Sequence, residues 1–189
     1  MFDYDEAFSR NLGGLTPDEQ TRMRRARVAV AGMGGAGGVH VQGLARLGVG
    51  AFNLTDFDHF ELANFNRQAG AAMSTIGQPK AEAMRAFALD GNPECDVRVF
   101  GEGLNAGNLG DYLEGVDVLI DAIDFFANDL RPLLYQEARA RGIPVVCSAP
   151  LAAGASLIVF LPGGMPFEAY FGFDGCDDVT RAVRFLVGM

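Results

Sequence analysis

The amino-acid sequence predicts an α/β fold in which a mainly parallel sheet is covered by helices on both faces. Short apolar runs alternate with helical segments along most of the chain, an order that is typical of a parallel sheet. The first run, residues 27–32, ends in a glycine-rich turn that leads directly into a helical segment. Together these features predict a Rossmann-like architecture.

Residues 1–26 are predicted to form a helical arm in front of the sheet, and residues 27–189 to form one compact domain. Thr16 is placed to cap a helix that begins at Pro17, and Glu19 stands three residues later, where it completes a capping box. A chain of 189 residues that is 49% hydrophobic falls in the size range of a single domain.

The remaining elements follow from apolar patterning and from turn residues. Helices are expected at residues 38–47, 80–89, 129–141 and 179–187, with a short one near Leu109. Strands are expected at residues 27–32, 51–56, 96–100, 116–122, 143–147 and 156–161.

The composition restricts the location and the partners of the protein. No apolar run is long enough to cross a bilayer and the start is acidic, so we expect a cytoplasmic protein without membrane contact. The net charge of −9 disfavours a surface that binds many phosphates of a nucleic acid. Three cysteines without a Cys-x-x-Cys pair suggest neither a disulfide framework nor a thiolate zinc site.

The glycine-rich turn predicts nucleotide binding. Its glycines permit a tight turn, bring the backbone close to phosphates and let the helix pack closely on the strand. Asp56 follows 24 residues after the first glycine, at the end of the second strand, where it can accept hydrogen bonds from ribose hydroxyls. The glycines of the turn are Gly32, Gly34, Gly35 and Gly37. An NAD-dependent oxidoreductase would show the same two features, so the rest of the chain must decide which nucleotide binds.

Charged residues after the second and fourth strands favour ATP. In an open parallel sheet the ligand lies beyond the carboxyl ends of the strands, so these segments are expected to surround one site. Arg67 and Lys80 would place two cations near phosphates there, and Asp124 can hold the magnesium ion that accompanies a triphosphate.

Several linked motifs resemble those of the ThiF/MoeB/HesA family, the adenylating domains related to ubiquitin-activating enzymes. The similarity covers residues 8–166. It rests on the glycine turn, Asp56-Phe57-Asp58, Asn64-x-Asn66-Arg67-Gln68, Gly77-x-x-Lys80 and Asp121-Ala122-Ile123-Asp124, which stand in the order and spacing of the family.

The resemblance implies a role for each matching residue. Asp56 would bind ribose, Asp124 would coordinate magnesium, and Arg10 would reach into the ATP site of a partner subunit, which implies a homodimer. The residues implied to act in the reaction are Arg10, Arg67, Lys80 and Asp124. Those implied to bind the nucleotide are Gly32, Gly34, Gly35, Gly37, Asp56, Asp58, Asn64, Arg67 and Lys80.

The implied reaction is attack by a carboxylate on the α-phosphate of ATP, which gives an acyl-adenylate and pyrophosphate. The resemblance favours the C-terminal carboxylate of a small ubiquitin-like or sulfur-carrier protein as the acceptor. Two alternatives stay open. The chain is also similar to the branch that dehydrates threonylcarbamoyladenosine in tRNA, and a catalytically silent ATP-binding scaffold would keep the same fold.

The sequence departs from the family pattern in several places. The stretch at residues 166–170 lacks the paired Cys-x-x-Cys motifs of many members, so no structural zinc is expected. Phe125 stands where the family commonly has Asn. Cys147 and Cys176 are candidates for a thioester or persulfide only by residue type. Since family members usually continue further, the chain is either a fragment or a minimal member, and whether Met189 is the native end stays open.

Overall fold

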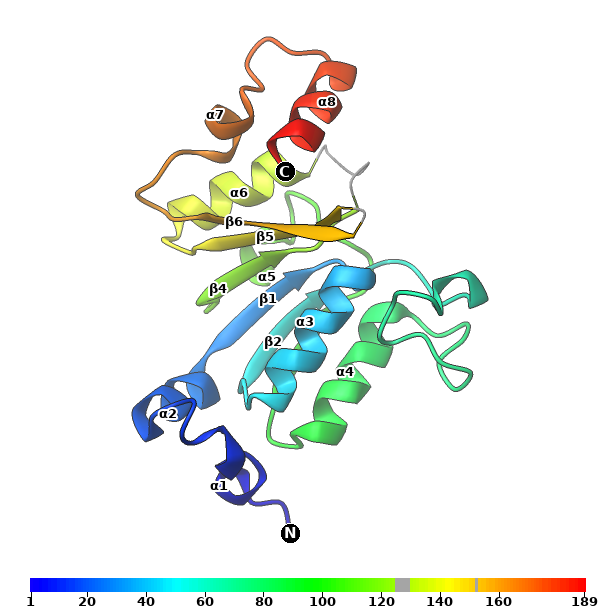
Figure 1. Cartoon of the computed structure of the whole chain (residues 1–189), viewed down its shortest axis with the longest axis vertical. Helices are drawn as coiled ribbons and strands as arrows, with labels where there is room; N and C mark the ends of the chain where they lie inside the picture. The colour runs from blue at the N-terminus through cyan, green and yellow to red at the C-terminus, as the bar shows by residue number, and fades with distance from the viewer. Residues whose placement is uncertain (125–129, 152) are drawn as a thin grey trace.

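The computed structural model describes residues 1–124, 130–151 and 153–189 (Figure 1). The strands are β1 (Arg27–Ala31), β2 (Ala51–Thr55), β3 (Asp96–Phe100), β4 (Val118–Asp121), β5 (Val145–Leu151) and β6 (Gly154–Phe160). The helices are α1 (Tyr4–Ala7), α2 (Pro17–Arg25), α3 (Gly35–Arg46), α4 (Lys80–Gly91), α5 (Leu109–Tyr112), α6 (Arg131–Ala140), α7 (Phe167–Phe171) and α8 (Asp178–Gly188). Single 3-10 turns occur at Ser9–Asn11 and Leu62–Asn64.

The strands form one sheet in the order β3-β2-β1-β4-β5-β6. Strands β1 to β5 run parallel, and β6 pairs antiparallel with β5 from Val145 opposite Phe160 to Leu151 opposite Gly154. The predicted Rossmann-like α/β fold is therefore confirmed.

Two hydrophobic cores lie on opposite faces of the sheet, because consecutive side chains of a strand point to opposite sides. Val28 and Val30 of β1 belong to the core under α3 and α4. Ala29 and Ala31 belong to the core under α5 and α6, which continues beneath α7 and α8. Figure 1 shows α3 and α4 side by side over one half of the sheet and α6 next to β5 and β6. The prediction of helices on both faces is confirmed.

The start of α3 and the end of β5 differ from the prediction. Helix α3 begins at Gly35 rather than at residue 38, because the glycines of the turn themselves adopt helical backbone despite their low propensity. Strand β5 runs to Leu151, four residues beyond the predicted end, because the returning β6 pairs with its whole length. The short α1 and α7 were missed, since four or five residues show no helical period. Asp129, the expected start of a helix, lies outside the described residues.

The N-terminal arm packs against the end of α3 that is remote from the glycine turn. The Tyr4 hydroxyl donates to the carbonyl of Gly48, and Gln20 Nε2 donates to the carbonyl of Leu47 at 3.0 Å. The capping box of Thr16 and Glu19 is present as predicted. The division into residues 1–26 and 27–189 stays a prediction.

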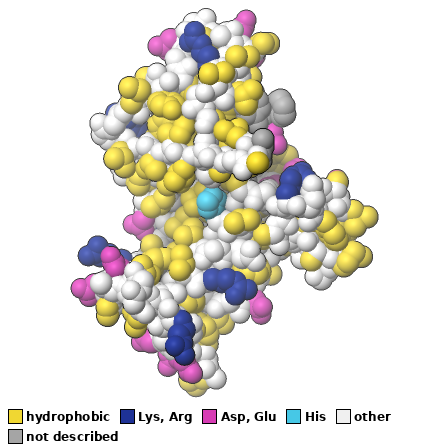
Figure 2. All heavy atoms as spheres, viewed as in Figure 1, with side chains coloured by type: hydrophobic (Ala, Val, Ile, Leu, Met, Phe, Trp, Pro, Cys, Tyr) yellow, Lys and Arg dark blue, Asp and Glu magenta, His cyan; other side chains and the backbone are white. Residues whose placement is uncertain are grey.

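Hydrophobic side chains gather over the upper half of the face in Figure 2, around β6, α7 and α8. Charged side chains are frequent over the lower half, around the N-terminal helices. Within the described part of the chain, none of the helices has the length and apolar content that spanning a membrane requires.

Candidate nucleotide-binding site

Strand register brings the predicted motifs to one edge of the sheet. Ala31, the last residue of β1, lies between Thr55 of β2 and Asp121 of β4. The amide of Gly32 donates to the carbonyl of Thr55 at 2.9 Å, and the amide of Ala122 donates to the carbonyl of Ala31 at 2.9 Å. The residues that follow the three strands are therefore neighbours at their carboxyl ends, where open parallel sheets bind ligands.

The glycine turn is so tight that two of its glycines admit no side chain. A Cβ atom on Gly37 would lie 1.8 Å from the carbonyl oxygen of Gly32, and a Cβ atom on Gly32 would lie 2.4 Å from that of Ala122. Gly32 also has a φ of 94°, a backbone conformation that favours glycine. At the start of α3, Gly34 provides no side-chain cap, so the first amides of the helix are available to an anion.

Asp56 is tied to the glycine turn. One carboxylate oxygen accepts the amide of Met33 at 2.7 Å, and the other accepts the amide of Asp58 at 2.8 Å. The residue is half-buried, and a carboxylate can accept about four hydrogen bonds. Asp56 therefore keeps acceptor capacity beside the turn, as a ribose ligand requires.

Lys80 and Asp58 form an ion pair that the sequence did not indicate. Lys80 opens α4 and is only 6% exposed, and its Nζ lies 3.0 Å from Asp58 Oδ2. The amide of Lys80 donates to the carbonyl of Asp58 at 2.9 Å. Asp58, whose amide donates to Asp56, therefore holds the Lys80 ammonium group through its carboxylate.

The segment after β2 brings Arg67 against the glycine turn. A Cβ atom on Gly35 would lie 3.4 Å from the carbonyl oxygen of Arg67 and 3.8 Å from its Cγ. The exposed Arg67 guanidinium donates to the carbonyl of Ala63 at 3.0 Å and to Asn66 Oδ1 at 2.9 Å. Asn64 is buried, and its Oδ1 accepts the amide of Glu61 at 2.9 Å, so this side chain also shapes the loop.

Gln68 is a further residue of this segment to which the sequence assigned no role. The residue is 8% exposed, and its Nε2 lies 3.9 Å from the Cβ position of Gly34. Its buried Oε1 has no hydrogen-bond partner among the residues that the structure describes. The only signal in the sequence was its place in the Asn-x-Asn-Arg-Gln motif.

Asp121, the last residue of β4, forms hydrogen bonds with residues of α6. Asp121 Oδ2 accepts Arg131 Nε at 2.9 Å and the Tyr135 hydroxyl at 2.8 Å, while Oδ1 accepts the amide of Ile123 at 3.1 Å. Arg131 Nη1 donates to the carbonyl of Asp124 at 3.2 Å. We call Asp121, Arg131 and Tyr135 the Asp121 cluster. The sequence missed Arg131 and Tyr135, and Phe125 lies outside the described residues.

Arg10 is not brought together with the other predicted residues. It lies in the 3-10 turn of the arm, and the neighbouring Asn11 donates to the carbonyl of Leu47 at 3.1 Å. Leu47 is at the far end of α3, a helix of 12 residues and therefore about 18 Å long. Arg10 therefore lies away from the glycine turn of its own chain.

The cysteines differ in accessibility. Cys147 is buried between Asp121 and Met189, and burial raises the pKa of its thiol to about 12. Burial also raises the pKa of the Cys95 thiol to about 11. Cys176 is partly exposed on the loop before α8. Cys147 therefore has the environment of an inert core residue rather than of a nucleophile.

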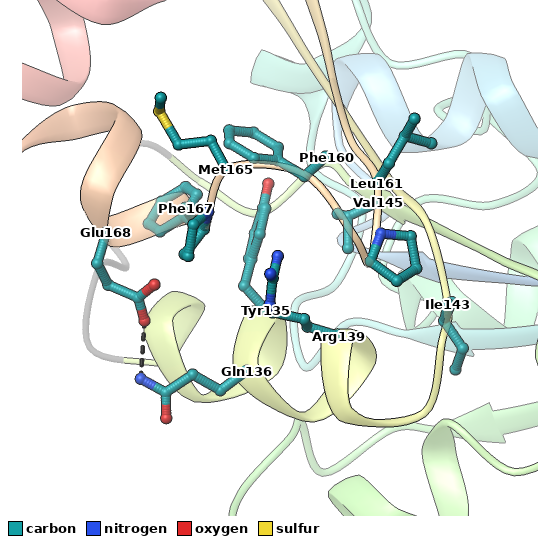
Figure 3. Close-up of a pocket in the computed structure, with 12 residues that line it drawn as sticks. Tyr135, Gln136, Arg139, Ile143, Val145, Phe160, Leu161, Met165, Phe167 and Glu168 are labelled. Carbon is teal, nitrogen blue, oxygen red and sulfur yellow. Dashed lines mark hydrogen bonds between the residues drawn. The ribbon is translucent and has the colours of Figure 1, made fainter.

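A separate cavity of about 250 Å³ lies at the opposite edge of the sheet. Figure 3 shows Tyr135, Phe160 and Phe167 around it, with Gln136 and Glu168 joined across its rim by a hydrogen bond of 2.7 Å. Since Ile143 and Val145 mark the amino end of β5, this cavity is distinct from the candidate nucleotide site.

Comparison with known proteins identifies the family. The model of the ThiF family matches residues 8–184. The tRNA threonylcarbamoyladenosine dehydratase of Haemophilus influenzae is 41% identical over 122 residues, which are 62% of this chain and 47% of that protein. The SAMP-activating enzyme E1 of Haloferax volcanii is 34% identical over 168 residues, 88% of this chain and 62% of that protein.

A solved relative has the same fold. The structure of the E. coli tRNA N6-threonylcarbamoyladenosine dehydratase in complex with ATP has a TM-score of 0.71 and 31% identity, and the match covers 76% of this chain and 58% of that one. The chain thus spans about half to two thirds of the length of these relatives. From its sequence match and its fold, the chain belongs to the ThiF family.

Proposed function

We propose that this chain is an ATP-dependent adenylating enzyme that activates the C-terminal carboxylate of a ubiquitin-like or sulfur-carrier protein. The observation that carries the proposal is the shared edge of the sheet. There the start of α3, which has no side-chain cap, adjoins Asp56 and the Asn64–Gln68 segment, and Asp58 pairs with the Lys80 ammonium group. A helix start that can bind an anion, an acceptor for ribose hydroxyls and two cations match the parts of a bound nucleoside triphosphate.

In the proposed reaction the acceptor carboxylate attacks the α-phosphate and pyrophosphate leaves. Negative charge then grows on the bridging oxygen, and fixed cations stabilise that charge more strongly in the transition state than in bound ATP. Lys80 is already held in place by Asp58, so its ammonium group needs little reorganisation. Arg67 lies on the glycine turn and would supply the second cation.

Magnesium is proposed to bind at Asp124, where it would neutralise charge on the phosphates. Among the described residues, no group of three or more His, Cys, Asp and Glu side chains is arranged to hold a metal ion. A single carboxylate nevertheless fits, because Mg²⁺ commonly takes one or two carboxylates and completes its coordination with phosphates and water.

Arg10 is proposed to act in the site of a second copy of the chain. Its position beside the far end of α3 keeps it from its own glycine turn, so a role in catalysis requires a homodimer. We also keep the cytoplasm as the expected location.

The test of the proposed function is ATP–pyrophosphate exchange with magnesium, with candidate carrier proteins added one at a time. We expect carrier-dependent exchange that falls by about 10³- to 10⁵-fold in Arg67→Ala, the scale for a phosphoryl-transfer arginine, and that is also lost in Asp124→Ala. Arg141→Ala is the matched control, since this arginine pairs with Glu137 at the opposite edge of the sheet. Undiminished exchange in Arg67→Ala would contradict the assignment.

A second candidate function is adenylation of the threonylcarbamoyl carboxylate on tRNA. It is favoured by relatives of 41% and 38% identity that carry the name tRNA threonylcarbamoyladenosine dehydratase. The net charge of −9 disfavours it. Specific tRNA binding without any carrier-dependent exchange would establish this second candidate, whereas ATP binding without exchange or tRNA binding would favour a scaffold.

A further inference from the structure

Arg131 is buried at the start of α6, next to the last residue of β4. It is 3% exposed, and its Nε lies 2.9 Å from Asp121 Oδ2, whose side chain has no exposure to solvent. Tyr135, one turn further along α6, donates its hydroxyl to the same oxygen at 2.8 Å. The Asp121 carboxylate is therefore engaged by two side chains of one helix and is inaccessible to a ligand.

The remaining donors of Arg131 face the backbone that leads into the nucleotide edge. Nη1 donates to the carbonyl of Asp124 at 3.2 Å, and Nη2 donates to the carbonyl of Ile123. The carbonyl groups of Ile123 and Asp124, which flank the Asp124 Cα, are thus both hydrogen-bonded by Arg131. Arg131 therefore holds the main chain of Asp124, the proposed magnesium ligand.

Helix α8 covers the guanidinium group. The Arg131 Cζ lies 4.7 Å from the centre of the Phe185 ring, a cation–π distance, and Phe185 is itself buried. Cys147 of β5 also contacts Met189 at the end of the chain, with 3.9 Å between the sulfur atoms. Helix α8 therefore packs directly on Arg131, the residue that holds the Asp124 backbone.

Stability alone does not account for this arrangement. A buried ion pair is a weak source of stability, because desolvation of both charges offsets their attraction. A planar guanidinium can, however, hold a carboxylate and two carbonyls in one fixed geometry, which an ammonium group cannot do. What the residue uniquely contributes is the position of the Ile123–Asp124 backbone.

We propose that Arg131 is a positioning residue for the Asp124 carboxylate and that Phe185 couples α8 to this role. The inference rests on the proposed function, which places magnesium at Asp124. Partners that orient metal ligands in this indirect way typically change metal affinity by about 10- to 100-fold when they are replaced. Arg131 acts through Asp124 and is not itself a catalytic residue.

The test compares ATP binding with magnesium and ATP binding with EDTA, measured by calorimetry on the full chain. The wild type is expected to bind ATP more tightly with magnesium. In Arg131→Lys this enhancement should fall by about 10-fold or more, while binding in EDTA stays within about twofold. Arg139→Lys is the matched control on the same helix, because Arg139 is exposed and donates to the carbonyl of Gly164.

The outcomes separate this inference from the proposed function. If Arg131→Lys keeps the full enhancement, or loses binding equally with and without magnesium, the positioning role is overturned while the proposed function stands. If the wild type shows no enhancement, or Asp124→Asn keeps it, the magnesium assignment fails and the positioning role fails with it. Phe185→Leu provides a second variant should Arg131→Lys not fold, and an unchanged enhancement in folded Phe185→Leu would overturn the coupling to α8.

Discussion

Asp56 and Asp121 stand at the ends of the two strands that flank β1, but their surroundings are opposite. Asp56 is half-buried and accepts the backbone amides of Met33 and Asp58. The Asp121 side chain has no exposed surface, and its carboxylate accepts hydrogen bonds from Arg131 and Tyr135. Both carboxylates lie at the carboxyl ends of their strands, where the candidate site is. Their burial decides which of them a ligand can reach.

Register explains the difference. Asp121 is level with Ala31 and Thr55, so its side chain follows that of Ala31 into the core beneath α6. Asp56 comes one residue beyond that level, where the paired part of β2 has ended. Side chains one residue apart along a strand point to opposite faces of the sheet. A difference of one residue therefore decides whether the carboxylate lies in the core or at the candidate site.

The largest expected effect on stability comes from Asp121→Ala. Removal of this carboxylate leaves the Arg131 guanidinium buried without its counter-charge, which typically costs about 3–5 kcal/mol of unfolding free energy. Asp56→Ala removes an acceptor from two amides near solvent and should cost about 1 kcal/mol. Urea unfolding of both variants measures the difference, and equal losses would contradict the distinction between the two carboxylates.

A somewhat smaller loss is expected when the turn beside Asp56 is overfilled. In Gly37→Ala the new Cβ would lie 1.8 Å from the Gly32 carbonyl, so backbone must move, at a cost of about 1–3 kcal/mol or more. Gly43→Ala is the matched control in α3. Its Cβ meets no atom of the described residues within 4 Å, and helix propensity should make it stabilising by about 0.5–1 kcal/mol. Thermal unfolding of the two variants should therefore shift in opposite directions, and a Gly37→Ala variant as stable as the wild type would show that the turn can relax.

The smallest effect concerns His40, which is half-buried like Asp56. Its Nε2 lies 2.9 Å from Ser148 Oγ, and desolvation lowers the pKa of the imidazole below its ordinary value of 6.5. The unfolded chain then binds the proton more readily, so stability should decline as the pH falls from about 6.5 to the folded-state pKa, and level off below it. Unfolding free energies measured against pH should lose this slope in His40→Gln and keep it in a variant of the exposed His59.

The sequence predicted the elements that carry a strong local pattern. The alternation of strands and helices, the capping box of Thr16 and the glycine turn depend on residues close together in the chain, and all three are present in the structure. The expected absence of a structural zinc and the proposed roles of all candidate site residues, including Arg10, Asp56, Arg67, Lys80 and Asp124, stay predictions. The predicted start of α3 and the predicted end of β5 were wrong, because glycines in helical conformation and pairing with β6 leave no local signal in the sequence.

The sequence by itself determined the order of the elements and the place of the glycine turn, because these follow from local periodicity. It also determined which segments meet beside that turn, because the carboxyl ends of parallel strands lie together. Only the tertiary structure decided which charged side chains pair with one another. The contacts of Lys80 with Asp58 and of Arg131 with Asp121 depend on how separate elements pack, and a guanidinium or ammonium group has the same chemistry in the sequence whether it lies in solvent or in a core.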